Sequence, residues 1–180
     1  AGGPEDDGDQ ARADVLGAGV GAGDCVISIS ASGTTAYTVS GQRAAKASGA
    51  RTIAIAGNAG SPLLEESEIA ICLETGAEVI SGSTRLAAGT AQKAALNMLS
   101  TLIGVKLGHV HENFMVNLTA DNAKLIGRAT AIVARVTGCD GPTAARSMQE
   151  AGNSVKPAIL LAAGARDLSE AARLLAASDG

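Results

Sequence analysis

The chain has 180 residues, enough for one medium domain with a sizeable core or for a domain with a small appendage. It is 46% hydrophobic but only 1% aromatic, and its formal net charge is -4, from 14 basic and 18 acidic residues. The scattered charges and the scarcity of aromatic residues argue against a nucleic-acid-binding surface, and no apolar run reaches transmembrane length. We therefore expect a cytoplasmic protein, not attached to a membrane, whose core is packed with Ala, Val, Ile and Leu.

The first 23 residues are acidic at first and then rich in Gly and Ala. They predict a short helix over residues 10–16, followed by a loop. From Cys25 the run CVISIS is rich in β-branched residues and nearly continuously apolar, which predicts a strand buried on both faces. The strand ends in the turn SASGTT, and a helix over residues 37–48 is expected to close at Gly49.

Two further strands are predicted, over residues 52–57 and 69–74, with a short helix beginning at Pro62 between them. A long helix follows within residues 78–107, where apolar residues recur at spacings of three and four. Strands alternating with helices predict an α/β fold with a parallel sheet. Helices on both of its faces would make a three-layer, flavodoxin-like sandwich.

The last part of the chain is predicted to be helical. Residues 122–136 have the apolar stripe of one helix, and three short helical segments follow a break at residues 138–142. We therefore divide the chain into a domain of residues 1–136 and a small all-helical subdomain of residues 137–180.

The cysteines Cys25, Cys72 and Cys139 are an odd, widely spaced set, and two of them lie in the apolar strand-like runs. We expect buried reduced thiols, in preference to a disulfide or a metal site. His109 and His111 would share one face of a strand, but the only nearby third ligand, Glu112, would point to the opposite face. A metal site is therefore disfavoured.

Two turns rich in hydroxyl residues stand where predicted strands lead into helices. Ligands of open parallel sheets bind beyond the carboxyl ends of the strands, and hydroxyls, backbone amides and a helix N-terminus together suit an anion. The absence of a Cβ at Gly33 would let an oxyanion approach the backbone. Neither a Walker-type motif nor a GxGxxG motif is present, so we expect a sugar phosphate bound without a nucleotide cofactor, with ordinary capped helix starts as the alternative. The candidate residues are Ser30, Ser32, Gly33, Thr34 and Thr35 in the first turn and Ser81, Ser83 and Thr84 in the second.

The string AEVISGSTRLAAGTAQKAALNMLST, residues 77–101, is very similar to the signature of the N-acetylmuramic acid 6-phosphate etherases, which belong to the SIS (sugar isomerase) domain proteins. ASGTTAY, NAGS and NFMVNLTADNAKL resemble further landmarks of that family, and the resemblance extends over the whole chain. It implies a SIS-type fold and a homodimer. It also implies a cofactor-free lyase that cleaves the lactyl ether of its substrate to N-acetylglucosamine 6-phosphate and D-lactate in cell-wall recycling.

The resemblance also implies roles for individual residues. Glu5 matches a catalytic acid/base, and Ser83 matches a serine that contacts the sugar or the phosphate. Glu78 and Ser81 flank that site and could touch the sugar. The phosphate-holding hydroxyls of the family fall on Ser30, Ser32 and Thr35.

The chain departs from the family pattern at its start. The second catalytic glutamate and the first phosphate-contacting loop of the family would lie before residue 1, and Pro4 follows Gly3 where the family has about a helix more sequence. We interpret the chain as a fragment or a degenerate relative. A non-catalytic phosphosugar-sensing regulatory module and an aldose–ketose phosphosugar isomerase remain alternatives.

Overall fold

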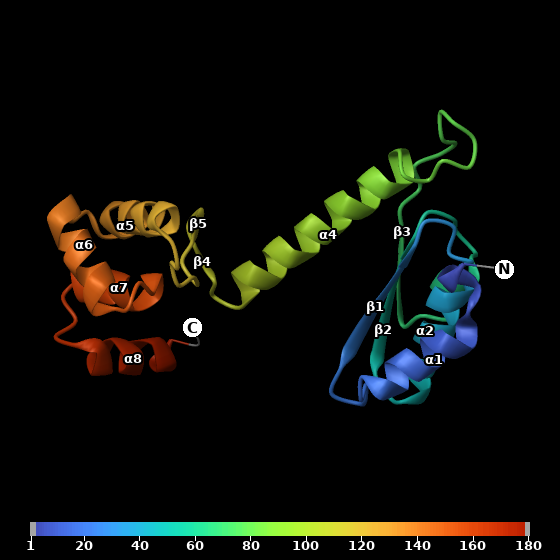
Figure 1. Cartoon of the computed structure of the whole chain (residues 1–180), viewed down its shortest axis with the longest axis horizontal. Coiled ribbons are helices and arrows are strands. Elements are labelled where there is room, and N and C mark those ends of the chain that lie inside the picture. Colours follow the sequence, from blue (N-terminus) through green and yellow to red (C-terminus); the bar gives the residue numbers. More distant parts are fainter. Residues whose placement is uncertain (1–2, 179–180) are drawn as a thin grey trace. The chain divides into compact units, whose positions relative to one another are not determined.

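The computed structural model describes residues 3–178, which form two compact units divided between Met98 and Leu99 (Figure 1). The terminal residues 1–2 and 179–180, which the expected domain division includes, lie outside the described part of the chain. Among the described residues, no helix combines the length and the apolarity needed to cross a membrane.

The first unit contains a parallel sheet of three strands in the order β1-β2-β3, flanked by helices, which confirms the predicted α/β fold. Every strand and helix expected in this part of the chain is present, with ends that differ from the prediction by one or two residues at most sites. The elements in chain order are α1 (Gly8–Gly17), β1 (Cys25–Ser30), α2 (Ala36–Ala47), β2 (Arg51–Ala56), α3 (Pro62–Glu65) and β3 (Ile69–Cys72). The helix α4 (Ala87–Lys106) begins in this unit and continues past the division between Met98 and Leu99.

One face of the sheet is covered by α2 and α3. Ala54 and Ala56 of β2 lie on this face and are fully buried against Val39, Leu63 and Leu64. The small alanine side chains let the helices approach the sheet closely, as the composition indicated. Gln42 of α2, also buried, donates from Nε2 to the carbonyl oxygen of Leu63 at 2.8 Å and so joins α2 to the start of α3.

The opposite face of the sheet is only partly covered among the described residues. The parallel register places Ile27, Ile53 and Ile69 in one row, and the two outer members keep 36% and 49% of their surface exposed. The expectation that β1 is buried on both faces is therefore wrong, because β1 is an edge strand of a three-stranded sheet.

The cysteines correct a second expectation. Cys25, the first residue of β1, and Cys72, the last residue of β3, are both exposed, whereas burial was predicted. Each stands at the end of an edge strand, where the sheet covers neither side chain. Cys139 is partly buried, and all three cysteines are free thiols.

The N-terminal segment packs on the outside of α2. A short 3-10 helix, η1 (Pro4–Asp6), leads into α1, whose first backbone amides are capped by Asp7, since its carboxylate accepts from the amide of Gln10 at 2.9 Å. At Gly8 the two helices are so close that an added Cβ would lie 2.5 Å from Oγ of Ser40. The absence of a side chain at Gly8 therefore lets the start of α1 approach α2 closely.

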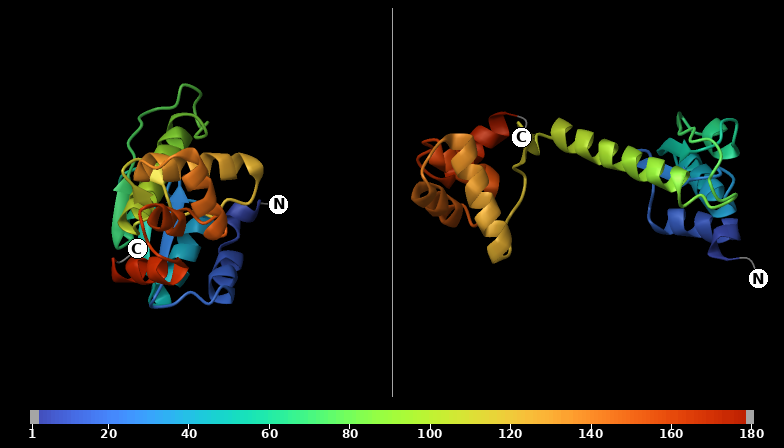
Figure 2. Two further views of the ribbon diagram at one scale, coloured as in Figure 1. Left: turned by 90° about the vertical axis from the view of Figure 1, so that its left-hand side faces the viewer. Right: turned by 90° about the horizontal axis from the view of Figure 1, so that it is seen from above.

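The second unit consists of helices around one apolar core (Figure 2) and of a hairpin whose two strands have two residues each. Fully buried Val133, Ala144, Met148 and Val155 join three of its helices, and an isolated bridge between Thr119 and Ser154 ties in the segment that precedes them. Its elements are β4 (Val110–His111), β5 (Phe114–Met115), α5 (Ala123–Thr137), α6 (Gly141–Glu150), α7 (Val155–Ala162) and α8 (Leu168–Ala177). Because α5 packs with α6 and α7, it lies in the same compact unit as the C-terminal helices. The division of the chain at residue 136 stays a prediction.

Candidate functional site

The turn after β1 is organised around one buried hydroxyl group. Oγ of Ser30 lies 2.8 Å from Oγ1 of Thr35 and 3.3 Å from Oγ of Ser32, and it accepts from the amide of Gly33 at 3.1 Å. Ser30 itself is only 7% exposed, whereas Ser32 and Thr35 are half-buried. Three of the four hydroxyls predicted for this turn therefore converge on one point, and Thr34 donates to Ser32 from its outer side.

The loop that follows β2 holds this turn in place. The amide of Gly57 donates to the carbonyl of Ala31 at 2.9 Å, and the side chain of Asn58 donates to the carbonyl of Ser32 at 3.1 Å. Gly33 has a φ of +73°, and an added Cβ would lie 2.2 Å from Oγ of Ser61. The NAGS loop thus packs directly against the hydroxyl-rich turn, and a glycine is required at the point of contact.

Glu5 faces the same pocket as these hydroxyls. A pocket of about 670 Å³ is lined by Glu5 from η1 and by Ser30, Ser32 and Thr35, and Thr84 reaches it from the second turn. None of the described residues lining it is basic. An anion bound here would therefore be held by neutral hydroxyl and amide donors, as in other phosphate sites that contain no basic side chain.

Sequence reasoning missed the wall formed by Gln10, Asp14 and Tyr37. Both oxygens of the Asp14 carboxylate accept hydrogen bonds, one from the hydroxyl of Tyr37 at 2.5 Å and the other from Nε2 of Gln10 at 2.7 Å. These two bonds, that from Tyr37 first, hold the pKa of Asp14 below its ordinary value, and the contact with Asp14 raises the pKa of Tyr37. The spacing of four between Gln10 and Asp14 on one helix was the available signal.

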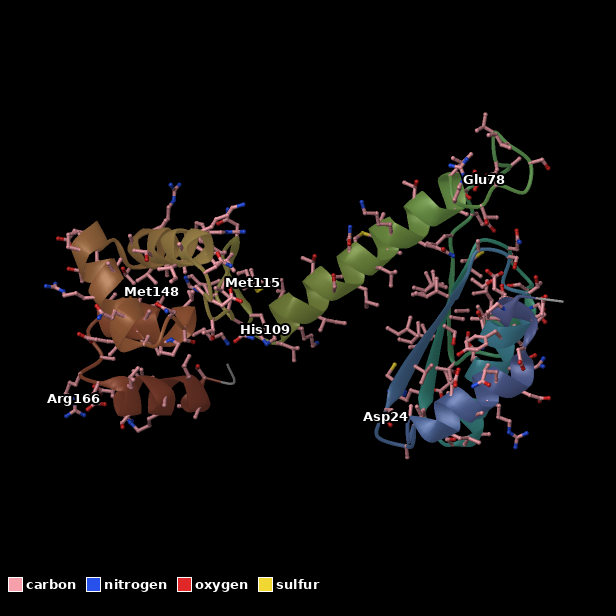
Figure 3. The ribbon with its side chains drawn as sticks, viewed as in Figure 1. Asp24, Glu78, His109, Met115, Met148 and Arg166 are labelled. Carbon is pink, nitrogen blue, oxygen red and sulfur yellow. The ribbon has the colours of Figure 1, made fainter. Side chains whose placement is uncertain are left out.

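Glu78 joins the second turn to α4, because its two carboxylate oxygens accept from the amides of Ala87 and Ala88 at 2.8 and 2.9 Å. The N-terminus of α4 is thus capped by a carboxylate of the chain itself, and Figure 3 shows Glu78 beside the first turn of this helix. The contact of Glu78 with the sugar stays a prediction.

Ser81 and Thr84 line a smaller pocket of about 340 Å³, together with Glu78 and Asn58. Thr84 also lines the pocket that contains Glu5, the larger of these two and called the larger pocket below, so the two pockets share one wall. Ser83 lines neither of them; its amide donates to the carbonyl of Ile80 at 2.9 Å within the turn. Gly33 shapes the first turn from behind without lining either pocket.

The histidine pair gives no metal centre among residues 3–178, where no group of three or more possible metal ligands comes together. His109 precedes the hairpin strand β4, which contains His111.

Fold and site together place the chain among the α/β proteins with an open parallel sheet, in which ligand-binding loops follow the strands. The model of the SIS domain matches residues 7–102, which contain all three strands and both hydroxyl-rich turns. The chain therefore belongs to the SIS domain family.

Relatives with a more specific name match nearly the whole chain. An N-acetylmuramic acid 6-phosphate etherase of Deinococcus radiodurans is 43% identical over 178 residues, spanning 99% of this chain and 58% of that protein. The etherase of Serratia proteamaculans is 43% identical over 99% of this chain and 60% of its own length. That of Symbiobacterium thermophilum is 48% identical over 88% of this chain and 52% of its own length. The chain thus spans little more than half the length of these relatives.

Proposed function

We propose that the chain is the phosphosugar-binding part of an N-acetylmuramic acid 6-phosphate etherase, a carbon–oxygen lyase that acts without a cofactor. The observation that carries the proposal is that Glu5 lines the same pocket as Ser30, Ser32 and Thr35. The similarity to named etherases over 99% of the chain supports the choice of substrate within the SIS family.

The reaction requires a proton donor and a proton acceptor near a bound phosphosugar. A base removes the proton next to the ring-opened aldehyde, and the carbon–oxygen bond to the lactyl group breaks as an acid protonates the leaving oxygen. Water then adds across the resulting double bond, which gives N-acetylglucosamine 6-phosphate and D-lactate. A carboxyl group suits either proton transfer, and Glu5 is our candidate for one of them.

The hydroxyl-rich turn suits the phosphate group of such a substrate. Ser30, Ser32 and Thr35 are proposed to hold it, with the backbone at Gly33 close by. Ser81 and Ser83 are proposed to reach the sugar from the second turn. Glu78 fixes that turn to α4 through two backbone amides, and it is proposed to touch the sugar through its remaining acceptor positions.

We further propose that the protein is cytoplasmic and works as a homodimer, with α4 in the interface. α4 has a stripe of exposed apolar side chains at helical spacing: Met98, Leu102 and Val105 are 61%, 65% and 52% exposed. Ala91 and Ala95 continue this stripe toward the start of the helix, where small side chains permit close contact between helices. A second copy of the chain is the partner that this stripe would pack against.

The function is tested by incubating the complete protein with N-acetylmuramic acid 6-phosphate and measuring the D-lactate released. We expect release by the wild-type protein and none by Glu5→Gln, which keeps the shape of the side chain but cannot take up a proton in the same way. Both proteins should be stabilised against heat by N-acetylglucosamine 6-phosphate, because binding does not need the proton transfer. Thermal stabilisation of the wild type without any D-lactate would contradict the lyase and support a non-catalytic sensor.

A further inference from the structure

The larger pocket has a second polar wall, which offers carboxylate acceptors where the hydroxyl-rich turn offers hydrogen-bond donors. Gln10 and Asp14 of α1 and Tyr37 of α2 line it together with Glu5. Asp14 is the centre of this wall, because its two oxygens accept from Tyr37 at 2.5 Å and from Gln10 at 2.7 Å. Its pKa lies below the ordinary value, so the side chain is an anion at neutral pH.

This wall retains capacity for a ligand. An ionised carboxylate has about four acceptor positions, of which these two bonds use half. Asp14 is exposed, Tyr37 is half-buried, and both line the pocket, so a bound ligand can meet a carboxylate acceptor and an aromatic side chain there. Carboxylate acceptors beside an aromatic ring suit a sugar, whose hydroxyl and amide N–H groups donate and whose C–H face is apolar.

The two walls differ in the charge that they favour. The hydroxyls and amides of the Ser30–Thr35 turn can donate to a phosphate, whereas Asp14 and Glu5 would repel one. A phosphosugar can therefore satisfy both walls in one orientation only, with its phosphate at the turn and its neutral donors at Asp14. Inorganic phosphate would use the turn alone.

Resting on the proposed function, we propose that Gln10, Asp14 and Tyr37 form a sugar-recognition subsite in which Asp14 accepts a hydroxyl or amide N–H of the bound phosphosugar. The subsite orients the sugar relative to Glu5 and distinguishes a sugar phosphate from a free phosphate. Asp14 and Tyr37 are thus specificity-determining residues.

The test measures two dissociation constants by titration calorimetry on the complete protein, one for N-acetylglucosamine 6-phosphate and one for inorganic phosphate. The variants are Asp14→Asn, which removes the charge at nearly constant shape, and Tyr37→Phe, which keeps the ring but removes the hydroxyl. We expect Asp14→Asn to weaken sugar phosphate binding by roughly 10-fold while inorganic phosphate changes by less than about twofold, since a charge-assisted hydrogen bond is lost only with the sugar. Tyr37→Phe should also raise the ratio of the dissociation constant for the sugar phosphate to that for inorganic phosphate, by a smaller factor.

The matched control is Arg43→Gln. Arg43 also ties α2 to a neighbouring segment through side-chain hydrogen bonds, to both carboxylate oxygens of Glu66, but it does not line the larger pocket. Its loss should leave the ratio of the two dissociation constants unchanged.

Three results would overturn the proposal. Unchanged affinities in both variants would show that the sugar does not contact this wall, and an equal loss for both ligands would show that Asp14 only supports the turn. The subsite would also be excluded if the wild-type protein bound N-acetylglucosamine 6-phosphate no more tightly than inorganic phosphate. D-lactate release by the wild type reports separately on the proposed function, so the two failures can be told apart.

Discussion

At the scale of single residues, Gly33 is the position on which the hydroxyl-rich turn depends most. Its φ of +73° lies in the left-handed region, and any Cβ would collide with Ser61. The same turn places Ser30, Ser32 and Thr35 around one point. The arrangement of the hydroxyls in the proposed phosphate site therefore depends on the backbone conformation of this turn.

We predict that Gly33→Ala lowers the free energy of unfolding of the first unit by about 2 kcal/mol or more, since the left-handed backbone alone costs a residue with a Cβ roughly 1–2 kcal/mol and the collision adds to this. Thermal or urea unfolding measures the change. The variant should also lose binding of N-acetylglucosamine 6-phosphate.

Gly41→Ala is the matched control for this substitution. Gly41 lies within α2, where an added Cβ would be 3.7 Å from Val15, an ordinary packing distance. Replacing a helical glycine by alanine should stabilise the unit by up to about 1 kcal/mol. If both variants changed the free energy of unfolding in the same direction and by the same amount, the left-handed conformation of Gly33 would not be the cause of the loss in Gly33→Ala.

The hydroxyl residues of the first turn could be predicted from the sequence, but the residues that line the pocket opposite them could not. A hydroxyl-rich turn after a strand directs attention to Ser30 and Thr35, because parallel strands bring such turns to one edge of the sheet. Asp14 and Tyr37 meet across 23 residues of sequence, a contact that no local pattern encodes. The exposure of Cys25 depends on the edge position of β1, which is likewise a property of the assembled sheet.

At the scale of elements, α4 begins later than its sequence indicates because of a distant cap. The turn SGST was the expected start, yet the helix begins at Ala87, where Glu78 supplies acceptors from nine and ten residues away. Where the cap is local, the helix begins close to its predicted start: α5, expected from residue 122, begins directly after Asn122, whose side chain accepts from the amide of Leu125 at 3.0 Å. The difference lies in the sequence distance between the cap and the helix.

We predict that Glu78→Ala frays the first turn of α4 and loosens the loop of residues 79–86, because two backbone amides lose their acceptor. The loss should be about 1 kcal/mol, the usual value of an N-terminal cap. Hydrogen exchange at the amides of Ala87 and Ala88 measures it directly.

Glu74→Ala is the control, because Glu74 is an exposed glutamate of the same segment. Exchange at Ala87 and Ala88 should be unchanged in this variant. If the amides of Ala87 and Ala88 exchanged at the same rate in Glu78→Ala and in the wild type, Glu78 would not be the cap of α4.

At the scale of the whole molecule, α4 has a row of apolar side chains at helical spacing, and Met98, Leu102 and Val105 in this row are exposed among the described residues. Soluble proteins seldom expose a continuous row of large apolar side chains unless it meets a partner. Helical periodicity predicted the stripe, but periodicity alone expects it to be buried. Its exposure supports the proposed homodimer.

We predict that Leu102→Asp converts the complete protein from dimer to monomer, because it places a charge in the middle of the stripe. Light scattering coupled to size-exclusion chromatography reports the molecular mass. Lys93→Asp, on the opposite side of α4 by helical spacing, should remain dimeric. A wild type that is monomeric at all concentrations would exclude the dimer.

The most direct measurement of the central claim is a crystal structure of the complete protein with N-acetylglucosamine 6-phosphate bound. Our account predicts the phosphate within hydrogen-bonding distance of Ser30, Ser32 and Thr35, with the sugar extending toward Glu5 and Asp14. A phosphate bound elsewhere, for example in the groove lined by Arg12 and Arg43 between α1 and α2, would contradict the account.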